Sequence, residues 1–219
     1  MLKIDLHTHQ RKSDSSLQIL NVFAQDLPLP EDENLYSAGL HPWHIGLVNP
    51  DECLWAMDQA ASKKNIVAIG ECGLDRSRTT DFNLQEGYFK QQIEIAEKHS
   101  KPLIIHCVRA FPEIIRLKKE SHTSIPWIIH GFQANYTTML QLIHHNFYFS
   151  VGKSLLFHPQ KKELIPLLPF DHLFLETDDL EISISSVYSL TAQLLKVDEE
   201  TLSGIISENF KGLFGNVFL

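Results

Sequence analysis

Two histidines separated by one residue stand near the start of the chain, in the segment KIDLHTHQ at positions 3–10. Side chains alternate along an extended strand, so Asp5, His7 and His9 would share one face of it. Paired imidazoles can bind a metal ion, but a His-x-His motif alone is weak, and two half-exposed histidines on a strand are the simpler interpretation. A metal site therefore requires further ligands elsewhere in the chain.

Ligand-type residues accompany four later apolar runs. VAIGECGLD carries Glu71, PLIIHCVR carries His106, WIIHGF carries His130 and LFLETDD carries Asp178. Any one of them could be a capping group or a satisfied core residue. Taken together they indicate a bound cation, because burying several imidazoles and carboxylates around one mouth is otherwise costly. The predicted metal ligands are His7, His9, Glu71, His106, His130 and Asp178.

The predicted ligand set favours two ions and a hydrolytic reaction. Neutral imidazoles and carboxylates suit Zn²⁺, Mn²⁺ or Ni²⁺, and carboxylates also accept Mg²⁺. Six protein ligands exceed the three or four usual for one catalytic zinc, so we expect two divalent metal ions with Glu71 as the bridge. A hydroxide held by two cations is a strong nucleophile, and Asp178 could both bind a metal and accept the proton of that water. Glu71 and Asp178 are therefore the predicted catalytic carboxylates.

Short apolar runs alternate with amphipathic stretches, which is the pattern of strand and helix units over a parallel sheet. Strands are predicted at residues 2–9, 17–24, 35–42, 66–73, 102–108, 127–132, 147–152 and 172–178, and helices include 84–99, 136–145 and one beginning at about Asp198. Eight strands suit a TIM-type (β/α)8 barrel, whose active sites lie at the C-terminal strand ends. We predict an α/β protein with a single domain over residues 1–219.

A barrel of this type usually takes about 250 residues, so a chain of 219 residues is short for the fold. The linkers QRKSDSS and QDLPLPEDEN, on either side of the second strand, lack helical periodicity. We therefore expect a distorted barrel whose first two outer helices are absent or reduced to a turn. The uncovered flank would be apolar and could bind a second copy of the chain, giving a homodimer.

Composition excludes some classes of partner. The chain is 43% hydrophobic and 21% charged, and its formal net charge of −8 argues against broad electrostatic capture of duplex nucleic acid. A local phosphate site is compatible with that charge. No apolar stretch reaches transmembrane length and the first residues do not form a secretory leader, so we expect a cytoplasmic protein without a membrane partner. The three cysteines have no paired spacing and predict neither a disulfide framework nor a zinc knuckle.

Several further polar residues stand near the predicted strand ends. Arg109 could hold a phosphate oxygen bidentately or form a salt bridge at the rim, and Lys153 is a second candidate for phosphate binding. His41 adjoins a proline that suggests a rigid turn, although it could also support a metal ligand. Trp43 could stack a terminal base, with packing as its simpler role. Glu176 has the strand parity of the last ligand and could orient a histidine.

These motifs resemble the TatD family of metal-dependent deoxyribonucleases, within the amidohydrolase-like barrel enzymes. The matching segments run from residue 4 to residue 215 and are DLHTH, AGLHPW, AIGECGLDR, LQEGYFKQQIEIAEKHSKPLIIHCVRA, IIHGF, FSVG, FLETD and SENFKGLFG. The resemblance implies a divalent-metal phosphodiesterase that trims DNA from its 3′ end, with the six predicted ligands in that role. The chain departs from the family pattern in a shorter first third, and in Asp179 and Leu180, where a small residue and a proline are usual. These departures affect the expected substrate cleft.

Three functions stay open at this point. The leading hypothesis is a metal-dependent deoxyribonuclease that acts on a DNA end or a small phosphodiester through a metal-bound hydroxide. A second keeps the metals but changes the bond to an amide, a lactone or an aminoacyl ester, since one barrel supports many chemistries. A third is a noncatalytic barrel that binds a metal or a protein partner, and the retention of all six ligand-type residues speaks against it.

Overall fold

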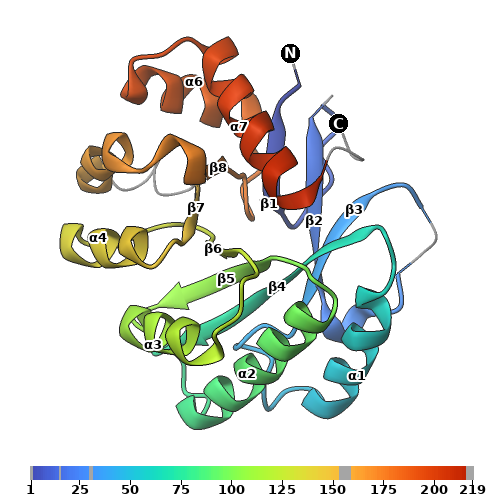
Figure 1. Cartoon of the computed structure of the whole chain (residues 1–219). Helices are drawn as coiled ribbons and strands as arrows, with labels where there is room; N and C mark the ends of the chain where they lie inside the picture. Colours follow the sequence, from blue (N-terminus) through green and yellow to red (C-terminus); the bar gives the residue numbers. More distant parts are fainter. Residues whose placement is uncertain (1, 15, 30–31, 153–158, 216–219) are drawn as a thin grey trace. The chain divides into compact units, whose positions relative to one another are not determined.

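The computed structural model describes residues 2–14, 16–29, 32–152 and 159–215 (Figure 1). Its strands are β1 (Ile4–Thr8), β2 (Leu17–Phe23), β3 (Leu35–Gly39), β4 (Ile66–Asp75), β5 (Leu103–Val108), β6 (Trp127–Ile129), β7 (Tyr148–Val151) and β8 (Leu173–Leu175). Its helices are α1 (Pro50–Ala61), α2 (Phe82–Lys98), α3 (Phe111–Ser121), α4 (Tyr136–His144), α6 (Ile184–Leu195) and α7 (Glu199–Phe214). Short 3₁₀ turns are η1 (Ala24–Asp26), η2 (Pro159–Leu167) and η3 (Phe170–His172).

The eight strands form one sheet in sequence order, from β1 to β8. The strand pairs β1–β2, β3–β4, β4–β5 and β7–β8 are parallel. The order closes on itself, because Thr8 at the end of β1 forms a parallel bridge with Asp178, just beyond β8. This is the topology of a TIM-type (β/α)8 barrel, so the predicted fold class is confirmed, and each of the eight predicted strands is present, although several end at other residues than predicted.

Backbone contacts divide the chain into two units, one of residues 21–128 and one of residues 1–20 with 129–219. The prediction of a single domain over 1–219 stays a prediction. In the unit of residues 21–128, α2 packs on β4 and buries Phe89 and Ile93, whose spacing of four residues places them on one face of the helix. Phe89 meets the buried Trp127 of β6 edge to face, with ring centroids 5.7 Å apart.

In the other unit, α6 and α7 pack against the first and last strands. The buried Tyr188 of α6 contacts β1 through its hydroxyl, which accepts a hydrogen bond from the Ile4 backbone N–H at 3.0 Å. Helix α7 begins where the sequence predicted, because the Asp198 side chain accepts a hydrogen bond from the Thr201 backbone N–H at 2.6 Å. These contacts hold β1, which carries the first histidines, in place.

The front of the chain is short of helices, as predicted. Among the described residues, no helix lies between β1 and β2, and only the three-residue turn η1 lies between β2 and β3. The apolar side chains Leu17, Leu20 and Val22 on β2 are nevertheless half-buried. The flank is therefore less exposed than the sequence suggested, and a homodimer through it stays a prediction.

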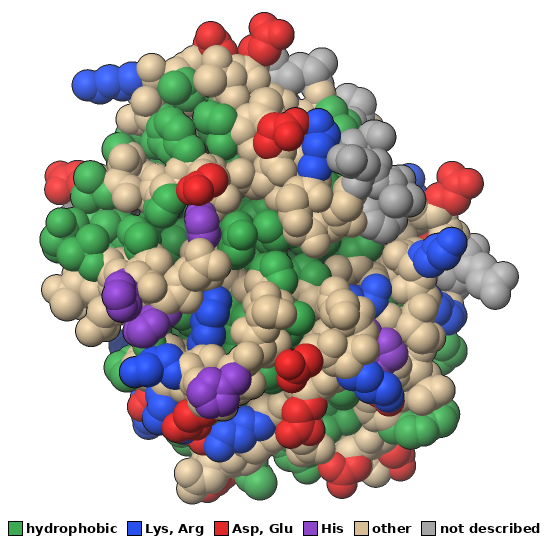
Figure 2. Space-filling view, in the orientation of Figure 1, with side chains coloured by type: hydrophobic (Ala, Val, Ile, Leu, Met, Phe, Trp, Pro, Cys, Tyr) green, Lys and Arg blue, Asp and Glu red, His purple; other side chains and the backbone are tan. Residues whose placement is uncertain are grey.

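The charges on the surface, the hydrophobicity of the helices and the state of the cysteines can be compared with the expectations from composition. On the face shown in Figure 2, acidic and basic side chains are interspersed, without a broad stripe of positive charge. None of the described helices has the length and hydrophobicity needed to cross a membrane. All three cysteines are free thiols.

Candidate functional site

The unit of residues 1–20 and 129–219 brings together three of the predicted ligands. His7 lies on β1, His9 directly follows this strand, and Asp178 follows β8, which neighbours β1. The Nε2 atom of His9 lies 3.4 Å from Asp178 Oδ1, and the Nε2 atom of His7 lies 3.8 Å from the same oxygen. His7 is fully buried. Two imidazole nitrogens thus face one carboxylate oxygen at distances long for hydrogen bonds.

Backbone hydrogen bonds hold Asp178 against β1. Its N–H donates to the His7 carbonyl at 2.9 Å, and its own carbonyl accepts from the His9 N–H at 3.1 Å. Its φ of +55° is uncommon for a residue with a side chain. The preceding Thr177 is held by Asp5, which accepts hydrogen bonds from the Thr177 N–H at 2.9 Å and from its hydroxyl at 2.6 Å. Burial raises the pKa of Asp5 to about 7.

His130, just beyond β6, joins this cluster. Its ring centroid lies 4.5 Å from that of His7. Its Nδ1 lies 3.5 Å from Oε1 of Glu176, a fully buried side chain, and the same oxygen accepts a hydrogen bond from the Gly131 N–H at 2.6 Å. A carboxylate at Nδ1 favours the tautomer that leaves Nε2 able to bind a metal ion. The orienting role predicted for Glu176 fits this geometry.

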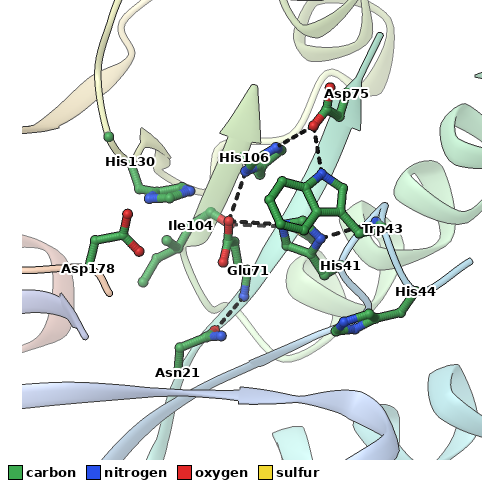
Figure 3. A network of polar contacts seen from close by, with 12 residues as sticks. Asn21, His41, Trp43, His44, Glu71, Asp75, Ile104, His106, His130 and Asp178 are labelled. Atoms are coloured by element: carbon green, nitrogen blue, oxygen red, sulfur yellow. Dashed lines mark hydrogen bonds and ion pairs between the residues drawn. The ribbon is translucent and has the colours of Figure 1, made fainter. Parts of the chain in front are cut away.

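In the unit of residues 21–128, Glu71 and His106 lie on the paired strands β4 and β5. His106 is the partner of Gly73 in the register, so Glu71 and Asp75, two residues to either side of Gly73, flank it on the same face of β4. His106 Nδ1 lies 2.9 Å from Glu71 Oε1, and His106 Nε2 lies 3.1 Å from Asp75 Oδ2 (Figure 3). One imidazole is thus held between two carboxylates.

Gly73 makes this arrangement possible. A Cβ atom at this position would lie 2.1 Å from the carbonyl oxygen of His106, and φ of Gly73 is +137°. No other amino acid fits such a close approach of β4 to β5 without displacing one of the strands. The sequence prediction ended this strand at Gly73, whereas β4 continues to Asp75.

Asp75 is a buried anchor for two side chains of the site. Its Oδ2 accepts a hydrogen bond from Trp43 Nε1 at 2.6 Å, besides facing His106, and its Oδ1 accepts from the N–H and hydroxyl of Ser77. Burial alone would raise the pKa of Asp75, but the hydrogen bonds from His106, Ser77 and Trp43 hold it well below its ordinary value. Asp75 is therefore a carboxylate that favours a proton on Nε2 of His106, which leaves Nδ1 as the ligand atom.

His41 supports the other proposed ligand of this unit, Glu71, by donating a hydrogen bond to it. The Trp43 backbone N–H donates to His41 Nδ1 at 3.1 Å, so in the neutral ring the proton is on Nε2, which lies 3.0 Å from Glu71 Oε1. The Glu71 backbone N–H donates to the Asn21 side chain at 2.8 Å. His41 is buried, and its contacts make it a hydrogen-bond donor that positions Glu71.

The donor sets in both units fit divalent metal ions. His7, His9 and Asp178 offer ligand atoms within 4.8 Å of one another, as do His41, Glu71 and His106. Imidazole nitrogen and carboxylate oxygen are the ligands of Zn²⁺ and of the other borderline divalent ions. The His41 tautomer described above leaves Glu71 and His106 as the ligands in the second set.

The roles of the two predicted substrate-binding residues, Arg109 and Lys153, stay predictions. Arg109 lies one residue beyond β5 and is exposed, with φ of +55°. No contact of the described residues tests its predicted role in phosphate binding. Lys153 lies outside the described residues.

Sequence reasoning missed Asp75 and undervalued His41 and Trp43. Asp75 has the strand parity of Glu71, so the same alternation that paired His7 with His9 would have placed it on the ligand face. Its position after the expected end of the strand concealed it. Trp43 is 41% exposed, and its ring also contacts His41 and His106, so both of its predicted roles, base stacking and packing, stay predictions.

Comparison with known proteins places these residues in a family context. A family model described as "TatD related DNase" matches residues 4–215. The chain is 28% identical over 204 residues to the uncharacterized metal-dependent hydrolase YabD of Bacillus subtilis, covering 85% of this chain and 80% of the relative. It is 30% identical over 149 residues to a protein of Pantoea ananatis named 3'-5' ssDNA/RNA exonuclease TatD, covering 65% of this chain and 56% of the relative.

Solved structures show the same fold. The crystal structure of YJJV, a TatD homolog from Escherichia coli, aligns with a TM-score of 0.82 at 19% identity and covers 97% of both chains. A hydrolase of the TatD family from Entamoeba histolytica aligns with a TM-score of 0.79 at 14% identity, again over 97% of both chains. At these identities the likeness concerns the fold.

Proposed function

Because the chain belongs to the TatD family of metal-dependent hydrolases, we propose that it hydrolyses phosphodiester bonds at the 3′ ends of single-stranded DNA with two divalent metal ions. The observation that carries the proposal is the pair of donor sets, His7 and His9 facing Asp178, and His106 facing Glu71. The printed name of the Pantoea ananatis relative supports the choice of nucleic acid and of the 3′ end.

The proposed ligands are His7, His9, Glu71, His106, His130 and Asp178. Divalent ions held by them would polarise a phosphodiester and make water nucleophilic near neutral pH. Asp178 is the proposed proton acceptor for the attacking water, because two hydrogen bonds fix its backbone against β1 and its side chain is partly exposed, with 17% accessible. Glu71 is the proposed second catalytic carboxylate.

Three neighbouring residues hold the ligands in position. Asp75 holds the ring of His106 by a hydrogen bond, and Glu176 lies 3.5 Å from Nδ1 of His130. His41 donates a hydrogen bond to Glu71. Supporting carboxylates of this kind typically change metal affinity or activity by about 10–100-fold when removed. The proposed ligands are therefore themselves contacted by polar side chains, as is expected at a catalytic metal site.

The proposed activity is tested with a single-stranded oligonucleotide labelled at its 5′ end. Purified protein with added Mg²⁺, Mn²⁺ or Zn²⁺ should produce a ladder of products shortened from the 3′ end, and chelation by EDTA should stop it. Asp178→Asn should lower kcat by about 10²-fold or more. The exposed His122→Asn, which removes a histidine outside the site, should leave the rate unchanged.

A panel of chromogenic substrates separates the alternatives. Turnover of a lactone or an amide but of no phosphodiester would replace the proposal with the second hydrolase hypothesis. Metal binding without turnover of any substrate would favour a noncatalytic protein. Full metal content and full activity in His106→Ala would contradict the proposed ligand set.

A further inference from the structure

Trp43 and Arg78 form a stack beside the metal ligand His106. The guanidinium carbon of Arg78 lies 3.6 Å from the centroid of the Trp43 ring, a close cation–π contact. The Trp43 centroid lies 5.6 Å from that of His106, with the two rings nearly perpendicular. Trp43 is 41% exposed as a residue, and the Arg78 side chain is 47% exposed. A planar cation is thus presented to solvent next to a proposed metal ligand.

The buried carboxylate of Asp75 holds the Trp43 ring of this stack in position. Trp43 Nε1 donates to Asp75 Oδ2 at 2.6 Å, and that oxygen also lies 3.1 Å from His106 Nε2. The same Asp75 therefore sets the position of the tryptophan ring and of the ligand ring. An exposed tryptophan anchored in this way is a rigid platform, which reduces the entropy lost when a ligand binds to it.

Arg78 keeps its charge available for a ligand, in contrast to its neighbour Arg76. Arg76 forms an ion pair with Glu113 at 2.6 Å. Among the described residues, the only carboxylate recorded near Arg78 is Asp75, at 4.0 Å from Nε, and both oxygens of Asp75 already accept shorter hydrogen bonds. The guanidinium donors of Arg78 are therefore directed to solvent or to a bound anion.

We propose that Trp43 and Arg78 form a subsite for a phosphate of a single-stranded nucleic acid, next to the phosphate that is cleaved. Arg78 donates hydrogen bonds to the phosphate oxygens, and Trp43 holds the guanidinium plane in position. The bound phosphate is the neighbouring one, because Trp43 and Asp75 each contact both Arg78 and His106, which sets the guanidinium one side chain away from the proposed metal ligand. This subsite rests on the proposed function for its substrate class and adds a specificity-determining pair to it.

The first test measures binding without turnover. A fluorescein-labelled single-stranded oligonucleotide is titrated with metal-free protein in EDTA, and anisotropy gives the dissociation constant at several salt concentrations. Arg78→Gln should raise the dissociation constant about tenfold. It should also reduce the slope of log affinity against log salt concentration by about one, the value expected for the loss of one phosphate contact. Trp43→Ala should weaken binding in the same direction. Arg76→Gln is the matched control and should bind like the wild type.

The second test uses the loaded enzyme with two substrates. Arg78→Gln should raise KM for the oligonucleotide with little change in kcat, and should leave hydrolysis of bis(p-nitrophenyl) phosphate unchanged, because that substrate has one phosphate. Unchanged oligonucleotide binding in Arg78→Gln, or equal losses in Arg76→Gln, would overturn the subsite. If the wild type binds the oligonucleotide through Arg78 but cleaves no phosphodiester, the subsite stands and the proposed hydrolysis fails.

Discussion

Asp75 links two side chains with different tasks, the proposed metal ligand His106 and the exposed Trp43. Its carboxylate is fully buried, and all of its recorded hydrogen-bond partners donate to it. Such a group stabilises one tautomer of His106 and leaves Nδ1 facing Glu71. At the scale of single residues, the site therefore depends on a carboxylate, Asp75, that the sequence prediction did not include.

We predict that Asp75→Asn weakens metal binding at Glu71 and His106. An amide no longer fixes the proton on His106 Nε2 as a carboxylate does, so the metal dissociation constant should rise about 10–100-fold. Cobalt titration followed by absorption spectroscopy, with metal content measured after dialysis, gives the comparison. Ser77→Ala, which removes a different partner of Asp75, is the control and should have a smaller effect. Equal affinities in wild type and Asp75→Asn would contradict the orienting role.

Lys118 provides a second prediction at this scale, about pH and stability. It lies on α3 with its ammonium group 5.8 Å from the centroid of the buried Trp127 ring, and burial lowers its pKa to about 8. The unfolded chain binds this proton below about pH 10.4 and the folded chain only below about pH 8. The contribution of Lys118 to stability is therefore fully present above pH 10.4, and it falls as the pH decreases to 8.

Lys118→Met should consequently raise the free energy of unfolding at pH 7 by on the order of 1 kcal/mol, after allowance for the partial exposure of the lysine. The gain should shrink as the pH approaches 10.4. Urea unfolding at both pH values measures it as a difference from wild type, because burial also raises the pKa values of Cys72 and Cys107. Lys119→Met, exposed on the same helix, is the control. A gain that is independent of pH would contradict the assignment to Lys118.

At the scale of elements, the sequence predicted the presence and order of the strands correctly, but it predicted their ends less well. Alternation on β1 placed His7 and His9 on one face, and the observed contacts with Asp178 agree. The predicted end of β4 was wrong. A glycine such as Gly73 is common where a strand ends, whereas in this fold it allows the close approach of two strands. A glycine required by a neighbouring backbone cannot be distinguished from a turn glycine without knowledge of that neighbour.

The role of Gly73 gives a prediction for the β4–β5 pair. In Gly73→Ala the new methyl group would meet the His106 carbonyl at 2.1 Å on a backbone with φ of +137°. We expect a loss of more than about 3 kcal/mol in the free energy of unfolding, together with weaker metal binding through displacement of His106. The matched control is Gly87→Ala on the exposed side of α2, where the added methyl meets nothing within 4 Å.

Gly87→Ala should stabilise the protein by roughly 0.5–1 kcal/mol, because alanine is the better helix former. Urea unfolding with circular dichroism detects both changes. If the two variants had similar stabilities, the close approach of β4 to β5 would not be the reason for the glycine at position 73.

At the scale of the whole molecule, the order of the elements was predictable because each strand carries its own apolar run and turn signals. The family and the barrel topology follow from motifs spread over residues 4–215. The extent of exposure at the short front of the chain was not predictable, because burial of Leu17, Leu20 and Val22 depends on tertiary packing that no local pattern records. The supporting role of His41 was undervalued for a similar reason, since its partner Glu71 is distant in sequence.

The proposed metal ions should also stabilise the whole chain. Ions that bind the folded but not the unfolded protein raise the free energy of unfolding by about 2.7 kcal/mol per site at a free concentration of 100 times the dissociation constant. Thermal unfolding should therefore shift upward on addition of Mn²⁺ or Zn²⁺ and return on chelation. His9→Ala should lose part of the shift, since it removes one ligand facing Asp178 while the donor set of Glu71 and His106 is retained. His122→Asn, which removes an exposed histidine whose φ of +52° asparagine tolerates, should keep the full shift. A shift that is equal in all three proteins would mean that the ions stabilise the chain from somewhere other than the proposed ligands.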